Sequence, residues 1–415
     1  MTHRAEEVPR TVGAVLTPAP STGPGTRTPV VRRRLAALTG AVLLGAVLAG
    51  CADGGAGPAE ARDDGAAPAE ASARPSAPAP TGDGPVRTSE GMLLVTDFGA
   101  DSVTFLDPSE PDGGSGRSSV KVGTAPYGIA LADDGTAWVA TAEGVAAVDT
   151  ATRRRTALIP YETDTGPVST GEYRGGGMGI ALSPDGTHVY VGVNVPGGNG
   201  TLEVVDTRER RVVTAVPVGR RPFDVDVSRD GRQVYTTDHD SFGVTVVDAG
   251  TWRSRRIEVA PYGTEGGLGS WLKPHYTAVR PSDGALLLPF EGERLAVVDP
   301  DSGRVRIERM TADTHQHGAV VTEDGTLYVV GTGPIDPAED EGPSLTVRAP
   351  GGEERVIPLD GPHEDVAVSA DGRTAYVSGG FTRDGYWNGL SVVDVATGEV
   401  RRVEAGARPL GIAVL

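Results

Sequence analysis

Six of the Asp-Gly pairs in the chain recur at intervals of about 41 to 53 residues. The pairs are Asp134-Gly135, Asp185-Gly186, Asp230-Gly231, Asp283-Gly284, Asp324-Gly325 and Asp371-Gly372. Asp-Gly between short alternating runs predicts a β-hairpin whose two turn positions both need positive φ. The interval is the length of one four-stranded propeller blade, so the repeat predicts an all-β ring of such blades.

A seventh blade is expected to be split between the two ends of the folded region. The last eight residues match the innermost strand of the other blades, such as Ala125–Leu131, and Met92–Asp97 matches a second strand. We therefore predict a seven-bladed β-propeller over residues 88–415. One blade is closed by the C-terminal strand (407–415) and the N-terminal strands (91–123). Closure removes exposed sheet edges, which favours a ring over a sandwich or a solenoid.

The second strands of the predicted blades resemble the YVTN repeat family. The resemblance is carried by Val234-Tyr235-Thr236-Thr237-Asp238, Val189-Tyr190-Val191-Gly192 and Ala375-Tyr376-Val377-Ser378. It covers residues 91–415 and implies an exported seven-bladed propeller similar to YncE. The family borders on lactonases and on cytochrome- or quinone-bearing propellers of the same fold. Because the repeat residues build blades rather than sites, the resemblance implies no particular ligand.

A segment typical of export signals precedes the folded region. Arginines at residues 32–34 are followed by an apolar run, Leu35–Ala49, which is too short for a transmembrane helix. Leu48-Ala49-Gly50-Cys51 resembles the lipobox of bacterial lipoproteins, whose cysteine is lipidated. We predict a signal peptide over residues 1–50, with an over-long leader or a later translation start. Lipidation of Cys51, the only cysteine, would anchor an extracytoplasmic protein to the membrane.

Residues 51–87 are expected to form a disordered tether. They are dominated by Ala, Pro, Gly, Asp and Glu and contain no aromatic residue, so they cannot bury enough surface to fold. The whole chain has a net charge of −18. This charge repels phosphate backbones and argues against a nucleic-acid partner, but it suits cations or basic partners. Closed propellers are commonly monomeric, and we expect a monomer here.

Histidines gather at one rim of the predicted ring. The links between blades and those between second and third strands share one face, and nearly all insertions fall in these links. Binding usually resides where long loops collect. Five of the seven histidines map to this face: His239, His275, His315, His317 and His363. Alignment of the inner strands gives one column at the channel mouth, made of Tyr127, Met178, Phe223, His275, His317, Glu364 and Leu410.

These polar side chains are candidate ligands of a divalent metal ion. Imidazoles and a carboxylate that converge on one point suit zinc or copper. The candidate ligands are His275, His315, His317, His363, Glu364 and His239. Flanking acidic residues are expected to add a ligand or to orient the rings; these are Asp238, Asp240, Glu291 and Asp365. The alternative is that the same side chains bond loop backbones in a water-filled channel. The apolar half of the column predicts a half-apolar pocket beside the metal.

Aromatic side chains on the same rim are candidates to contact a small ligand, or else pack loops onto blades. They are Trp271, Tyr276, Tyr386 and Trp387. The sequence contains no nucleophile elbow, phosphate loop or His-Glu-X-X-His motif, and we assign no catalytic residue. The pattern favours a lipid-anchored binding or scaffold module for a metal ion, a small ligand or an envelope protein. The alternatives are a metal-assisted hydrolase of the lactonase kind and a purely structural assembly protein.

Replacement Cys51→Ser is expected to abolish lipid attachment, because the lipid is transferred to a thiol that serine lacks. In cells fed a labelled fatty acid, the wild-type protein should carry the label and sediment with membranes. The variant should remain unlabelled. Label on the variant, or none on the wild type, would contradict the prediction of a lipoprotein.

Overall fold

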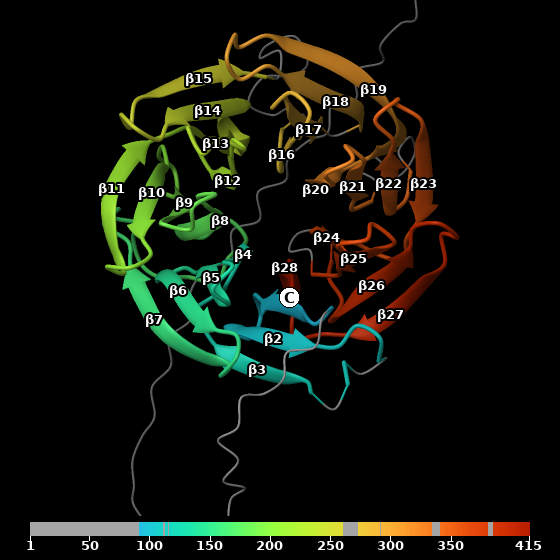
Figure 1. Ribbon diagram of the computed structural model, residues 1–415, viewed down its shortest axis with the longest axis horizontal. Helices are drawn as coiled ribbons and strands as arrows, with labels where there is room; N and C mark the ends of the chain where they lie inside the picture. Colours follow the sequence, from blue (N-terminus) through green and yellow to red (C-terminus); the bar gives the residue numbers. More distant parts are fainter. Residues whose placement is uncertain are drawn as a thin grey trace, which may run out of the picture. The chain divides into compact units, whose positions relative to one another are not determined.

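The computed structural model describes residues 91–110, 113–114, 116–259, 273–290, 292–333, 341–380 and 385–415. Their strands form seven four-stranded antiparallel sheets arranged in a ring (Figure 1). The predicted all-β, seven-bladed propeller is therefore confirmed. The described part of the chain contains a single short 3-10 helix, η1 (His239–Ser241), and no helix long and apolar enough to cross a membrane. The predicted signal peptide, Cys51 and tether lie outside the described residues.

Blades 1 to 4 follow one another along the chain. Blade 1 contains β28 (Pro409–Val414), β1 (Leu93–Asp97), β2 (Ser102–Leu106) and β3 (Ser118–Lys121). Blade 2 contains β4 (Ile129–Leu131), β5 (Thr136–Ala140), β6 (Gly144–Asp149) and β7 (Arg154–Pro160). Blade 3 contains β8 (Gly176–Leu182), β9 (His188–Asn194), β10 (Thr201–Asp206) and β11 (Arg211–Pro217). Blade 4 contains β12 (Pro222–Val227), β13 (Gln233–Asp238), β14 (Gly243–Asp248) and β15 (Ser254–Glu258).

Blades 5 to 7 complete the ring. Blade 5 contains β16 (Ala278–Val279), β17 (Leu286–Phe290), β18 (Gly292–Val298) and β19 (Val305–Thr314). Blade 6 contains β20 (Gln316–Val321), β21 (Leu327–Gly331), β22 (Ser344–Arg348) and β23 (Glu354–Pro358). Blade 7 contains β24 (Val366–Val368), β25 (Thr374–Ser378), β26 (Gly389–Asp394) and β27 (Val400–Glu404).

The two ends of the folded region meet in blade 1, as the sequence predicts. β28 pairs antiparallel with β1, and Leu93 lies opposite Val414. Two further backbone hydrogen bonds extend this ladder, from Gly91 N to Leu415 O (3.1 Å) and from Leu415 N to Met92 O (2.9 Å). The last residues of the chain therefore supply the innermost strand of the blade that the first described residues begin (Figure 1).

The middle strands of each blade are largely buried on both faces because every sheet packs between two neighbours. Every residue of β1 and β2 is buried, whereas the outer strand β3 alternates between half-buried and exposed side chains. One such interface joins blades 4 and 5 through Tyr235, Phe242, Leu286, Leu288 and Phe290. Burial of large apolar side chains between all neighbouring blades provides the main driving force for the ring.

The Asp-Gly turns differ from the predicted geometry. Only the glycine has positive φ, between 69° and 86° at the six turns, and the aspartate does not. In the first turn the Asp134 carboxylate instead accepts a hydrogen bond from the Thr136 backbone N–H (2.9 Å). The hairpins are thus wider than two-residue turns, and aspartate is selected for its side-chain acceptor rather than for positive φ.

Two of the second strands end in a buried aspartate with a shared bonding pattern. Asp238 accepts hydrogen bonds from the hydroxyls of Thr236 (2.8 Å) and Thr245 (2.5 Å), and Asp97 at the end of β1 is bonded in the same way. Burial raises the pKa of each carboxyl to about 6, although these hydrogen bonds partly oppose the shift. The ionised form therefore costs folding free energy at neutral pH.

Replacement Asp238→Asn should stabilise the protein more at pH 8 than at pH 5. Since the pKa is raised from 3.8 to about 6 on folding, this carboxyl stabilises the fold fully at low pH. That contribution is lost as the pH rises through 6. Asparagine stays neutral, so the difference between variant and wild type should grow by about 1 kcal/mol from pH 5 to pH 8. Thermal unfolding at the two pH values measures it, and an equal difference at both would contradict the prediction.

Candidate metal centre

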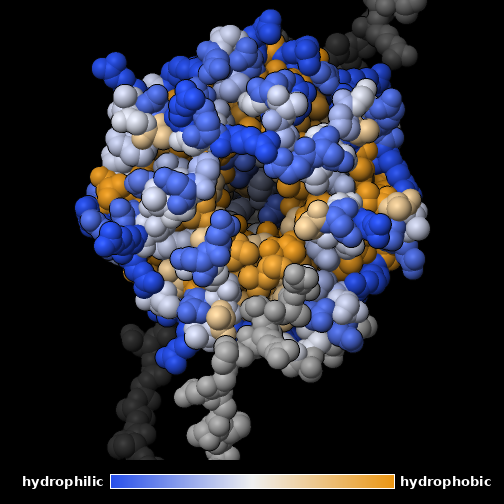
Figure 2. Space-filling model, viewed as in Figure 1, coloured by the Kyte–Doolittle hydropathy of each residue, from blue (hydrophilic) through white to orange (hydrophobic). Residues whose placement is uncertain are grey.

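The inner-strand registers place the predicted column at one level of the ring. In each blade, the column residue lies four positions before the last inner-strand residue that pairs with the second strand. In blade 4 this pair is Val227 and Val234, which gives Phe223, and in blade 5 Val279 pairs with Leu286, which gives His275. The same count in the other blades gives Tyr127, Met178, His317, Glu364 and Leu410. Figure 2 shows a hollow at the centre of the ring, bordered by hydrophilic surface on one side and by a hydrophobic patch on the other.

Four imidazoles from blades 4, 5 and 6 form a cluster of neighbouring rings. The Nε2 atoms of His239 and His275 are 3.0 Å apart, and those of His315 and His317 are 3.2 Å apart. One ring nitrogen from each of His275, His315 and His317 lies within 4.8 Å of the others. Nitrogens bound to one tetrahedral zinc ion at 2.0–2.1 Å are separated by about 3.3 Å. The spacing of His275, His315 and His317 therefore suits one shared ion, and His239 lies outside this group, next to His275.

The four rings come from the ends of strands rather than from their middles. His239 opens η1 directly after β13, and His275 precedes the two-residue strand β16. His315 joins β19 to β20, and His317 is the second residue of β20. All four side chains are buried, with at most 4% of any residue exposed. Strands anchor the backbone close to every ring, so the cluster is held by the rigid part of the fold.

Two carboxylates fix the orientation of two of these rings. Asp240 Oδ1 lies 2.9 Å from His239 Nδ1, and Glu364 Oε1 lies 3.1 Å from His317 Nδ1. A carboxylate keeps the proton on the nitrogen that it contacts, so each Nε2 presents its lone pair to the cluster. Arg221 Nη1 is farther from His239 Nδ1, at 3.4 Å, and Asp240 therefore decides this tautomer.

The surroundings of His239 keep its ring neutral. Burial lowers the pKa of His239 to about 3, and the hydrogen bond and negative charge of Asp240 only partly oppose the shift. Burial alone would raise the pKa of Asp240. The hydrogen bond with His239 and the nearby positive charges hold that pKa below its usual value. Arg221 (2.9 Å) and Lys273 (3.1 Å) pair with this carboxylate. A neutral imidazole is the form that binds a metal ion.

Arg221 and Lys273 are functional residues that were not predicted from the sequence. Both cations lie next to Asp240 in space but come from different blades. The Arg221 guanidinium also lies 3.5 Å from the centre of the Tyr173 ring. Only Lys273 stands out in the sequence, because it is one of two lysines in the chain and immediately precedes the Pro-His sequence of the site.

Glu364 has two partners at the same oxygen. Besides His317 Nδ1, its Oε1 accepts a hydrogen bond from the Tyr276 hydroxyl at 3.0 Å. Glu364 is 1% exposed and comes from blade 7, one blade beyond His317. Tyr276, predicted as a rim aromatic, therefore lies inside the site. Glu364, predicted as a metal ligand, contacts the nitrogen of His317 that points away from His315.

The other half of the column is an apolar cluster. Tyr127, Met178, Phe223 and Leu410 pack on one another together with Phe98 and Ala125, and Tyr276 packs against them. The ring of Phe223 meets His275 edge-on, with centroids 5.1 Å apart. The predicted division into polar and apolar halves is present in the structure. The apolar residues support the imidazoles from one side.

His363 lies apart from the four converging imidazoles. Its Nδ1 is 2.8 Å from the Gly361 carbonyl, its Nε2 is 2.8 Å from Ser391 Oγ, and its ring packs against Trp387. Burial lowers its pKa to about 4. Among the residues that the structure describes, the group able to share an ion contains His275, His315 and His317 but neither His239 nor His363. Both its ring nitrogens are used inside blade 7.

The remaining rim aromatics have separate surroundings. Trp271 lies outside the described residues. Tyr386 is 48% exposed and stacks with the Arg408 guanidinium, 4.1 Å from the ring centre. Trp387 packs a loop onto blade 7 so closely that a Cβ at Gly389 would lie 2.0 Å from its ring. Of the four predicted aromatics, the structure brings Tyr276 to the histidines.

The flanking acidic residues also lie in different surroundings. Asp240 orients His239, and Asp238 is bonded to threonine hydroxyls. Asp365 lines a separate cavity of about 240 Å³, here called the second chamber, whose wall includes residues of the apolar cluster. There, burial raises its pKa to about 7. Glu291 lies outside the described residues.

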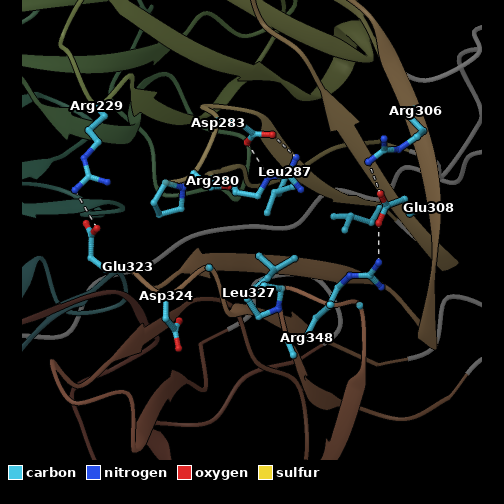
Figure 3. A pocket seen from close by; sticks show the side chains of 18 residues that line it. Arg229, Arg280, Asp283, Leu287, Arg306, Glu308, Glu323, Asp324, Leu327 and Arg348 are labelled. Atoms are coloured by element: carbon cyan, nitrogen blue, oxygen red, sulfur yellow. Dashed lines mark hydrogen bonds and ion pairs between the residues drawn. The ribbon is translucent and has the colours of Figure 1, made fainter.

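A cavity of about 560 Å³ lies between blades 5 and 6, beside their Asp-Gly turns (Figure 3). Four arginines line it, and each is paired with a carboxylate. The ion pairs are Arg280–Asp283 (2.8 Å), Arg306–Glu308 (2.6 Å), Arg348–Glu308 (2.6 Å) and Arg229–Glu323 (3.1 Å). Since its positive charges are already compensated, this cavity has less capacity for a charged ligand than the histidine cluster.

No family model matches the chain, and no curated protein matches it. Several solved structures share its fold. The periplasmic gluconolactonase of Pseudomonas aeruginosa is 17% identical with a TM-score of 0.56, over 79% of this chain and 99% of that one. A putative 6-phosphogluconolactonase from Bacteroides uniformis is 14% identical with a TM-score of 0.54, over 79% and 100%. Kuenenia stuttgartiensis hydrazine synthase is 19% identical with a TM-score of 0.55, over 69% and 88%. At these identities the likeness shows the fold alone.

Proposed function

We propose that this protein is an exported propeller that binds one transition-metal ion, zinc or copper, at the mouth of its channel. The observation that carries the proposal is the grouping of His275, His315 and His317 around one point, with His239 beside His275 and a carboxylate behind His239 and behind His317. Imidazole nitrogen suits zinc and copper. A carboxylate behind a histidine is the arrangement that orients metal-binding rings.

Binding is favoured over catalysis by the number of donors. His275, His315 and His317 would supply three ligands, and a shift of His239, whose Nε2 atom lies 3.0 Å from that of His275, would fill the fourth position of a tetrahedral ion. Catalytic zinc sites usually hold the metal with three protein groups and leave the fourth position to water. A filled coordination sphere suits a module that captures or stores the ion.

The location and family of the protein are part of the same proposal. Export and a lipid anchor at Cys51 are supported by the apolar run and the lipobox-like sequence. Membership of the YVTN repeat family is supported by the repeat residues and by the seven-bladed ring. The net charge of −18 favours cations, or a basic envelope protein, as partners of the anchored monomer and disfavours nucleic acid.

The metal site is tested by elemental analysis of residues 80–415, the compact unit that holds the whole ring, purified without a histidine tag. We expect close to one equivalent of zinc or copper after dialysis. The double variant His275→Ala/His317→Ala should lose it, because two of the four donors are removed.

The matched control is His363→Gln, which removes a buried imidazole outside the cluster and should keep the ion. Circular dichroism shows whether each variant folds. If the folded wild type holds no ion even after incubation with zinc or copper, the histidines are structural and the proposal is wrong.

Metal-assisted hydrolysis of a lactone is the second candidate. Two propellers of similar fold are described as a gluconolactonase and a putative 6-phosphogluconolactonase. A metal ion with an open position polarises a carbonyl and lowers the pKa of bound water. With His239 as fourth ligand that position is closed, so we expect the zinc-loaded wild type to hydrolyse gluconolactone no faster than buffer. Metal-dependent hydrolysis that disappears in His275→Ala/His317→Ala would instead identify an enzyme.

A further inference from the structure

We infer that Glu364 and Tyr276 are a positioning pair for His317, and that Glu364 is not a ligand of the metal ion. The inference rests on the metal site proposed above. Glu364 Oε1 lies 3.1 Å from His317 Nδ1, and the same oxygen accepts the Tyr276 hydroxyl at 3.0 Å. A proton held on Nδ1 leaves the Nε2 lone pair of His317 available for the ion.

The geometry of the imidazole ring separates Glu364 Oε1 from the ion. Nδ1 and Nε2 are on different edges of the ring, and the ion would lie beyond Nε2, next to His315. With a metal–nitrogen bond of about 2.0 Å on one side and the observed hydrogen bond on the other, Oε1 would be roughly 6 Å from the metal. Coordination through this oxygen would require both hydrogen bonds to break.

Tyr276 holds the carboxylate in place from a third blade. Its ring packs edge-on against Phe223, with centroids 5.5 Å apart, and it lines the second chamber. Tyr276 comes from blade 5, His317 from blade 6 and Glu364 from blade 7. The orientation of His317 is therefore set by contacts across two blade interfaces, in surroundings where Glu364 is 1% exposed. A buried hydrogen bond of this kind is strong because water does not compete for it.

The opposite side of the cluster is positioned differently. Asp240 orients His239, but its side chain is 21% exposed and is shared with Arg221 and Lys273. Loss of Asp240 would leave solvent and two cations around His239. Loss of Glu364 would leave the Nδ1–H of His317 without this acceptor in a buried position, so we expect the larger effect at Glu364.

The test compares Glu364→Ala, Glu364→Gln and Tyr276→Phe in residues 80–415, with zinc competition for affinity and Co²⁺ absorption for coordination. We expect Glu364→Ala to raise the zinc Kd by about 10- to 100-fold. One equivalent should still bind, and the intense tetrahedral Co²⁺ bands should be retained. Glu364→Gln should restore affinity to within about fivefold, because its amide oxygen still accepts the Nδ1 proton. Tyr276→Phe should weaken binding only a few-fold.

Asp365→Asn is the matched control, since this neighbouring carboxyl faces the second chamber and bonds the Val366 backbone N–H. It should leave both readouts unchanged. Weaker Co²⁺ bands of higher coordination in the wild type, lost equally in Glu364→Ala and Glu364→Gln, would identify Glu364 as a ligand. An unchanged Kd in Glu364→Ala would remove its positioning role. A wild type that binds neither Zn²⁺ nor Co²⁺ would overturn the metal site itself, and this inference with it.

Discussion

The pairing of β28 with β1 determines where every channel residue lies. Leu93 opposite Val414 brings the last strand of the chain into the blade that the first strand begins. Without this ladder the ring would open within blade 1, and β28 and β1 would expose unpaired backbone groups. Since the inner strands surround one channel, closure also sets the distance between side chains from blades that are far apart in the sequence. The histidine cluster depends on that distance.

Small residues next to the channel column allow the inner strands to approach closely. The position after the column is glycine in four blades: Gly128, Gly179, Gly318 and Gly411. A Cβ on Gly179 would lie 2.4 Å from Asp224 Cα, and one on Gly318 would lie 2.7 Å from Asp365 Cα. Any larger side chain would push neighbouring inner strands apart. These two glycines thus allow blades 3 and 4, and blades 6 and 7, to pack closely on either side of the histidine cluster.

The sequence is sufficient to predict how far along the central channel a residue lies, but not the direction of its side chain. The blade repeat predicted seven blades, closure through blade 1 and the whole column from Tyr127 to Leu410, because strand register follows from regular spacing. It did not separate His363 from His317. His363 is engaged by Gly361 and Ser391, and these local bonds leave no trace in the spacing. The ion pairs of Asp240 with Arg221 and Lys273 were missed for the same reason, since they join separate links between strands.

The placement of the two carboxylates answers the electrostatic problem that the proposed ion would create. Four neutral imidazoles give a dication no negative charge, and burial of an uncompensated charge is costly. Asp240 and Glu364 approach the cluster from opposite sides, each through the Nδ1 atom of one ring. They would offset the charge of the ion without occupying a coordination position. The same two hydrogen bonds thus orient the donors and compensate the charge, so a site made of histidines alone can be buried next to Phe223 and its apolar neighbours.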